Sequence, residues 1–91
     1  EVGDKRSIVS PLNNLGIVAY HQNDYVAAQH YYEQSLVLLR EFNNAFGVAY
    51  VLQNLGNVAH DLGDYALARH YKEESLELLR GLDDGIGIAA T

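Results

Sequence analysis

Apolar and small residues recur at steps of three and four along most of this chain, a spacing typical of α-helices that bury one face. Two such series occupy matching positions, namely Leu12, Leu15, Val18, Ala19 and Gln22, and then Leu52, Leu55, Val58, Ala59 and Leu62. A further series follows in residues 25–40, where one face would carry Ala28, Tyr32, Ser35, Leu36 and Leu39. The pattern predicts an all-α chain. We expect this second helix to close near Arg40 and its counterpart near Arg80, because a basic residue suits a helix C-terminus.

A short polar stretch separates the two helices of each predicted pair. Asn23 precedes Asp24, and Gly63 precedes Asp64. Both aspartates are predicted N-caps, because a carboxylate at that position accepts hydrogen bonds from free N–H groups of the first turn. Gly63 can adopt positive φ at the end of the preceding helix, where asparagine is the next most suitable residue. These signals predict antiparallel helix pairs, each with a very short turn.

The chain repeats itself with a period of 40 residues. Residues 12–51 placed over 52–91 without gaps give 19 identities in 40 positions, and a period of this size is typical of stacked helical units. We therefore expect a single repeat domain over residues 1–91, divided into a partial first helix (1–11), repeat 1 (12–51) and repeat 2 (52–91). The last part of repeat 2, residues 83–91, is expected to open a further helix.

Gly16 and Gly56 lie inside predicted helices, where a glycine costs about 1 kcal/mol relative to alanine. They hold the same position in the two repeats. We expect each to mark a close crossing between the two helices of its pair, with the small residues Ala28 and Ala68 facing it. Closer packing would then offset the cost in helix propensity.

Pro11 has no proline counterpart in the repeat, because Val51 and Thr91 hold its position. A proline inside a helix removes a hydrogen bond, whereas Ser10 and Pro11 suit an N-cap followed by a first helical position. We expect either a late helix start at Pro11 or a kink there, with Asp4–Val9 as a separate turn of helix.

The motif NLGxxAxxxxDYxxAxxxYxxSL in residues 14–36 resembles the tetratricopeptide repeat, and the resemblance extends over essentially the whole chain. The 40-residue period is similar to the longer repeats of kinesin light chains and of bacterial multidomain signalling regulators. Leu12 and Leu52 stand where the family usually has a bulky aromatic. Lys72 stands at the aromatic position held by Tyr32 in the first unit, so looser or solvent-facing packing is expected there. The resemblance implies a right-handed solenoid of antiparallel helix hairpins, whose first helices line a concave groove, and a non-catalytic protein that binds an extended peptide or a partner helix.

The resemblance also implies which residues line that groove, since they point away from the partner helix. Carried over to this chain they are Ser10, Asn13, Asn14, Ile17, Tyr20, His21, Tyr50, Gln53, Asn54, Asn57, His60 and Asp61. Asparagine amides donate and accept together, which suits a peptide backbone, and Asn14 and Asn54 could form a ladder. The alternative is that these amides bond locally to helix backbone or water. No lysine or arginine belongs to the set, so capture of a C-terminal carboxylate is not expected; the nearest cations are Lys5 and Arg6.

Composition excludes several classes of function. The net charge of −6 argues against nucleic acid as a partner; residues 1–40 carry −1 and residues 41–91 carry −5, which is interpreted as a solvated helix face. Absence of cysteine excludes a disulfide framework and favours an intracellular, cytoplasmic location. No apolar run is long enough to span a membrane. Because the chain begins at Glu1 without methionine, we expect a fragment of a larger signalling or scaffold protein.

No sequence motif indicates chemistry. Phosphate loops, HExxH and nucleophile motifs are all missing from the sequence, so neither an enzyme nor a cofactor is expected. His21 and His60 lie on neighbouring first helices, but without an evident third ligand a zinc site is not expected. The leading interpretation is therefore a peptide-binding module. The alternative is a homotypic assembly module that self-associates through its unfinished repeat ends, with residues 1–11 and 81–91 competing for one place.

Overall fold

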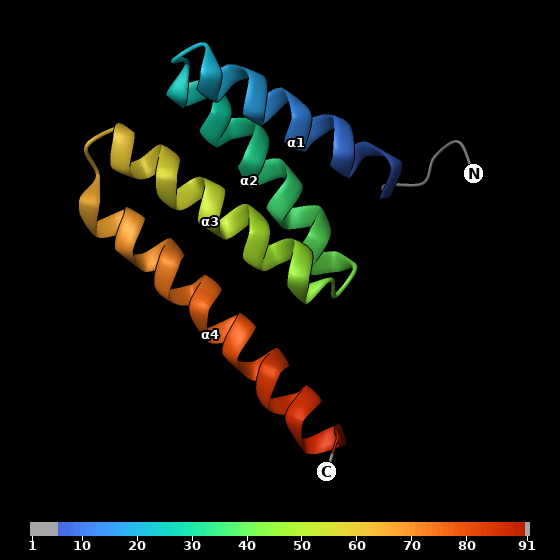
Figure 1. Ribbon diagram of the computed structural model, residues 1–91. Coiled ribbons are helices and arrows are strands. Elements are labelled where there is room, and N and C mark those ends of the chain that lie inside the picture. The colour runs from blue at the N-terminus through green and yellow to red at the C-terminus, as the bar shows by residue number, and fades with distance from the viewer. Residues whose placement is uncertain (1–5, 91) are drawn as a thin grey trace.

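Four helices fill the chain between Arg6 and Ala90 in a computed structural model that describes the backbone of residues 6–90 and the side chains of residues 9–82 (Figure 1). They are α1 (Arg6–His21), α2 (Tyr25–Glu41), α3 (Ala45–Asp61) and α4 (Tyr65–Ala90). Each helix packs against the next one along the chain, and no strand occurs within residues 6–90. The all-α fold of stacked helix hairpins is confirmed, with α1–α2 as the first hairpin and α3–α4 as the second.

The predicted turns are confirmed within both hairpins. Asn23 and Gly63 have positive φ, at 64° and 88°, so each reverses the chain directly after a helix. Asp24 and Asp64 then cap the next helix, each accepting a hydrogen bond of 3.2 Å from the backbone N–H three residues later. Equivalent local chemistry therefore produces the same tight reversal twice.

The connection between the two hairpins uses the same chemistry, although the sequence analysis did not predict it. Asn43 has a φ of 56°, and the Asn44 side chain accepts a hydrogen bond of 3.0 Å from the backbone N–H of Gly47. The residue pair Asn43-Asn44 therefore acts as Asn23-Asp24 does. This short link places α3 directly against α2.

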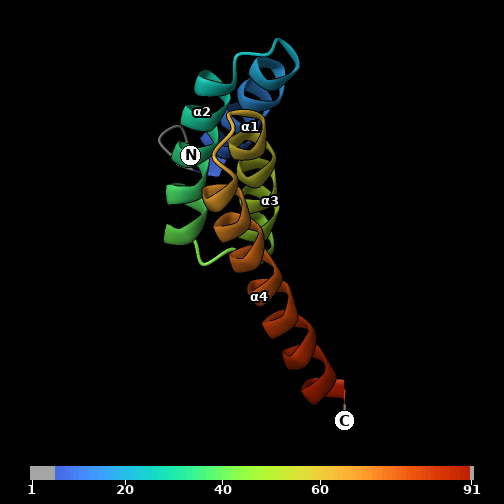
Figure 2. The same cartoon turned by 90° about the vertical axis from the view of Figure 1, so that its left-hand side faces the viewer.

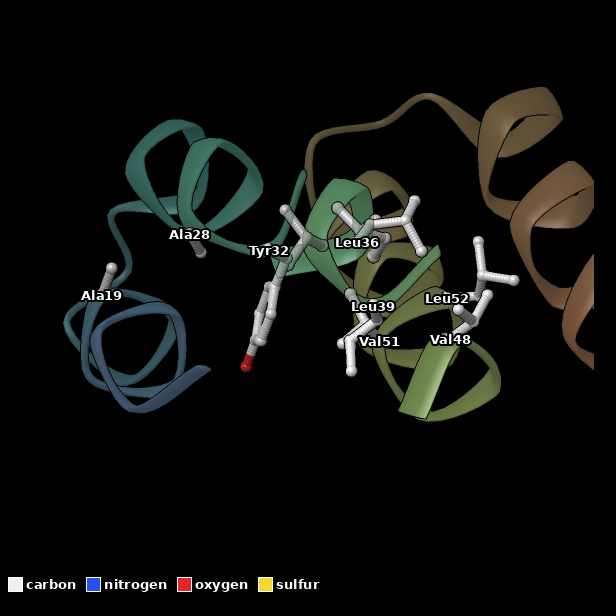
Figure 3. Packing of buried hydrophobic residues seen from close by; sticks show 10 residues of the cluster. Ala19, Ala28, Tyr32, Leu36, Leu39, Val48, Val51 and Leu52 are labelled. Carbon is white, nitrogen blue, oxygen red and sulfur yellow. The ribbon is translucent and has the colours of Figure 1, made fainter. Parts of the chain in front are cut away.

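The main core lies between α2 and α3 (Figure 3). All five residues predicted to share one face of the second helix are buried, namely Ala28, Tyr32, Ser35, Leu36 and Leu39. Ala28 lies toward Ala19 of α1 (Figure 3), and the cluster continues into a buried face of α3 that includes Val48, Val51, Leu52, Leu55 and Val58. The helix α2 therefore packs against both α1 and α3.

Gly16 and Gly56 both lie at close approaches, as predicted, but the neighbouring groups differ from the prediction. A Cβ added at Gly16 would lie 2.9 Å from the Tyr32 ring, and one at Gly56 would lie 2.8 Å from Cγ of Lys72. Ala68 contributes only its carbonyl oxygen, 3.4 Å from that second Cβ. Tyr32 and Lys72 therefore cover Gly16 and Gly56, and each lies four residues after the alanine that was predicted to do so.

The expected late start at Pro11 is wrong, because α1 begins at Arg6 and continues through Pro11 as one helix. The expected separate turn is therefore part of α1 from Arg6 onward, and Asp4 lies outside the described residues. Only about one turn of helix precedes Pro11, so the missing N–H removes a hydrogen bond close to a helix end. The proline side chain is exposed.

The expected end near Arg80 is also wrong, because α4 continues to Ala90. The backbone of residues 83–90 extends α4 instead of opening a further helix; Thr91 lies outside the described residues. Asp83 stands where Asn43 reverses the first repeat, and asparagine is favoured over aspartate at such a left-handed position.

Candidate functional site

The residues predicted to line a groove all lie on α1 and α3, the first helices of the two hairpins. In the view of Figure 2 the ribbons of α1 and α3 overlap to the right of α2. The exposed members are Ser10, Asn14, His21, Tyr50, Gln53, Asn57, His60 and Asp61, and the half-buried members are Asn13, Ile17, Tyr20 and Asn54. The set therefore forms two rows of surface side chains on neighbouring helices.

Tyr20 and Asp61 join these two rows at the C-terminal ends of α1 and α3. The Tyr20 hydroxyl donates a hydrogen bond to Oδ2 of Asp61. This bond, together with partial burial, raises the pKa of Tyr20 to about 12. Tyr20 is thus a neutral donor at physiological pH, and it fixes the position of the Asp61 carboxylate between the helices.

Aromatic contacts surround this junction. The Tyr20 ring lies with its centroid 5.4 Å from that of Tyr25. His60 packs edge-on against Tyr65 at 5.0 Å, and its Nδ1 is 3.7 Å from Oδ1 of Asp61. Each first helix is thereby tied to the tyrosine that opens its partner helix, which orients the polar groups at this end of the surface.

The amides of the two rows differ in their surroundings. Oδ1 of Asn13 and Nδ2 of Asn54 are buried without a hydrogen-bond partner among the described residues. Asn14 and Asn54 hold equivalent repeat positions, but Asn14 is exposed and Asn54 is half-buried. If both amides bind the same ligand, Asn14 therefore does so at the surface and Asn54 from a more buried position.

Phe46 is an exposed residue of α3 that the sequence analysis missed. Its side chain is 59% exposed, and that of Tyr50, one turn further along α3, is 50% exposed. Residues four apart share one face of a helix, so the two rings extend the α3 row toward the helix N-terminus. The apolar periodicity could have predicted this exposure, because Phe46 does not belong to the series of α3 residues that fills the core.

A cleft of about 390 Å³ separates the α3 row from α4 and is lined by Gln53, Asn57, Lys72 and Leu76. Nζ of Lys72 donates a hydrogen bond of 2.9 Å to Oδ1 of Asn57. The expectation that Lys5 and Arg6 are the nearest cations is therefore wrong, because the Lys72 ammonium group borders the predicted surface. The replacement of Tyr32 by lysine in the second repeat could have indicated this cation. The predicted solvent-facing position of Lys72 is confirmed.

Polar contacts also connect α2 with α4, the second helices of the hairpins. Arg40 forms an ion pair of 2.5 Å with Glu74, and the Tyr71 hydroxyl donates a hydrogen bond of 3.3 Å to Glu33. Burial, and then the nearby Glu33 carboxylate, raises the pKa of Tyr71. Both layers of helices are thus linked across the two hairpins, which fixes the spacing of α1 and α3.

The described residues lack two further features, a metal-binding group and a membrane-spanning helix. No group of three or more histidine, cysteine, aspartate or glutamate side chains among them could hold a metal ion. Nor is any helix, within the part of the chain that the structure describes, long and apolar enough to cross a membrane.

Comparison with protein families identifies the fold. The family model of the tetratricopeptide repeat matches residues 7–81, which include nearly all of α1, the whole of α2 and α3, and most of α4. The chain belongs to the tetratricopeptide-repeat family. Tetratricopeptide repeats are non-catalytic and generally mediate protein–protein interactions. Searches of the curated proteins and of the solved structures found no match.

Proposed function

We propose that this tetratricopeptide module binds an extended peptide or a helix of a partner protein along the exposed faces of α1 and α3. One observation carries the proposal: Phe46 and Tyr50 present two exposed aromatic rings on the same face of α3. Exposed aromatic residues are enriched at protein interfaces, because a rigid ring contributes a large contact area at a low cost in entropy. Amides beside them on both helices supply hydrogen bonds to a peptide backbone.

The charge of this surface favours a neutral or basic ligand. Asp61 is the acidic side chain among the residues of this surface, and Lys72 is the cation that borders it. A single lysine, already hydrogen-bonded to Asn57, is a weak clamp for a carboxylate. We therefore expect ligands that engage the aromatic and amide groups, with little dependence of affinity on salt.

Peptides selected from a random library against the 91-residue chain test this function. The double variant Phe46→Ala/Tyr50→Ala should weaken binding by about tenfold or more, because aromatic residues commonly dominate such interfaces. Asn14→Ala/Asn54→Ala tests the amide ladder separately. Gln34→Ala/Val37→Ala is the control, since both of its residues are exposed on α2. Selected peptides that bind all of these variants as tightly as the wild-type chain would contradict the proposal.

Homotypic assembly is the second candidate function. Leu15 and Val18 of α1 and Leu76 of α4 are large apolar side chains that remain exposed at opposite ends of the stack. Exposed apolar faces of this kind are typical of surfaces that another protein covers. Light scattering over a concentration series tests the idea, because self-association raises the apparent mass above the 10.1 kDa of one chain.

Further expectations from the sequence remain proposals. They are the division into residues 1–11, 12–51 and 52–91, a larger signalling or scaffold protein as the source, a cytoplasmic location, and a role that involves no cofactor, nucleic acid or membrane. The Asn43-Asn44 turn separates the two hairpins, whereas the proposed boundary between residues 51 and 52 marks the repeat register and lies inside α3.

A further inference from the structure

Equivalent residues of α1 and α3 differ sharply in exposure. Leu55 and Val58 of α3 are 0% and 1% exposed, whereas Leu15 and Val18, forty positions earlier, are 46% and 51% exposed. The difference arises because α3 packs against α2 on that side, whereas no helix within residues 6–90 covers the same face of α1. The apolar face that inserts α3 into the stack is thus present a second time on α1, and it is uncovered.

The opposite end of the stack shows the complementary difference. Leu36 of α2 is 8% exposed because α3 covers it, and its counterpart Leu76 of α4 is 56% exposed. Leu76 lines the cleft between α3 and α4, and that cleft is the repeat equivalent of the place beside α1 and α2 that α3 fills. Since α4 continues to Ala90, the chain does not fold back into this cleft between Tyr65 and Ala90.

We propose that α1 of a second copy of this chain docks in the cleft between α3 and α4, as α3 docks against the first hairpin. This inference makes the second proposed function, self-association, specific and does not depend on peptide binding. The occupant is identified by the repeat itself: α1 carries leucine and valine at the positions of Leu55 and Val58, which fill the internal site. A head-to-tail contact of this kind does not close on itself, so copies add to a growing chain instead of stopping at a dimer.

Two substitutions within the cleft weaken this contact relative to the internal one. Tyr32, buried in the internal site, is replaced by Lys72, and the half-buried Ile17 is replaced by Asn57. The two polar replacements bond to each other across the cleft, so docking must cover a hydrogen-bonded pair instead of an aromatic and an aliphatic side chain. The net charge of −6 on every copy adds repulsion. Association is therefore expected to be reversible and to strengthen with salt, because salt screens the repulsion and spares the apolar contact.

Mixing two interface variants tests the geometry directly. Val18→Glu removes the docking face of α1, and Leu76→Glu removes the receiving cleft; both side chains are exposed, so the fold should survive, as circular dichroism would verify. Sedimentation velocity should show a mass that rises with wild-type concentration up to about 1 mM. Each variant alone should remain monomeric. An equimolar mixture should form a 1:1 dimer and stop there, because one intact face and one intact cleft remain.

Two further variants sharpen the test. Lys72→Tyr restores the residue of the internal site and should tighten association by about tenfold, which corresponds to one buried aromatic contact. Val37→Glu is the matched control, because Val37 is equally exposed but lies on the outer side of α2, and glutamate already stands at the equivalent position 77. It should associate as the wild-type chain does.

The possible failures are distinguishable. If wild type and Lys72→Tyr both remain monomeric at the highest concentration, this interface and the second proposed function are both wrong. If association persists in Val18→Glu and Leu76→Glu, or if their mixture does not dimerise, self-association stands but this interface is overturned. Peptide binding is measured separately on the wild-type chain, at concentrations at which it is monomeric, so its outcome is independent of both.

Discussion

The two hairpins contain equivalent clefts with different occupancy. The cleft beside α1 and α2 holds α3 and includes Tyr32 in its buried lining, whereas the cleft between α3 and α4 is open and includes Lys72. Both hairpins have a glycine where their two helices approach closely. Tyr32 covers Gly16 in the first hairpin, and Lys72 covers Gly56 in the second. The same helix hairpin can therefore provide either a buried core or an exposed cleft. A few side chains of its second helix determine which of the two it provides.

Truncating the docking leucine of each hairpin should give the largest difference. Leu55→Ala should lower the free energy of unfolding by about 2–5 kcal/mol, because it leaves a cavity in a fully buried site. Leu15→Ala should cost less than about 1 kcal/mol, because its side chain is already half exposed. Urea unfolding followed by circular dichroism measures both. Equal losses of unfolding free energy would show that the two leucines have similar surroundings, which would contradict the difference in their burial.

Alanine at the two crossing glycines should give effects of opposite sign. Gly16→Ala places a Cβ against the buried Tyr32 ring, which has no room to move, so a net loss of about 1 kcal/mol is expected after the gain in helix propensity. Gly56→Ala meets the exposed Lys72 side chain, which can change rotamer, so stability should stay level or rise by up to about 1 kcal/mol. Thermal unfolding of the two variants checks the sign; a loss at Gly56 as large as that at Gly16 is the contrary result.

Removing the Tyr20 hydroxyl should have the smallest effect, and that effect should depend on pH. The pKa of Tyr20 is raised from 10.0 to about 12 in the folded chain, so folding favours the protonated phenol. Its contribution is fully present below pH 10 and is lost as the pH rises toward 12. Wild type should therefore melt slightly above Tyr20→Phe at neutral pH, and the gap should close in alkaline buffer. A gap that stays constant to pH 12 would contradict the link between Tyr20 and Asp61.

Local signals predicted most of the fold. The 40-residue repeat, the helical period and the residue pairs Asn23-Asp24 and Gly63-Asp64 determine helices, caps and turns through contacts within a few residues, and all of these predictions are confirmed. The predictions failed where one residue was given too much weight. Pro11 was expected either to start or to kink a helix, and the helix begins about one turn earlier. The match of residues 83–91 to 43–51 was expected to open a further helix, but the reversal that precedes such a helix needs Asn43.

The candidate site was less predictable, because it depends on contacts between helices. The repeat register placed the groove residues on α1 and α3, and the structure adds how they interact. Neither the bond between Tyr20 and Asp61 nor that between Lys72 and Asn57 follows from spacing, since their partners are separated by 41 and 15 positions. Phe46 was missed because it lies outside the core series, whereas a binding surface consists of residues that the core does not use.

The central claim is that the exposed face of α1 and α3 is the binding surface. Titration of a selected peptide into the ¹⁵N-labelled wild-type chain, at a concentration at which it is monomeric, tests it most directly through the amide chemical shifts. The claim predicts the largest shifts at Asn14, Phe46, Tyr50 and Gln53, with little change at Gln34 and Val37 on α2. Shifts concentrated on the outer sides of α2 and α4, with α1 and α3 unchanged, would contradict it.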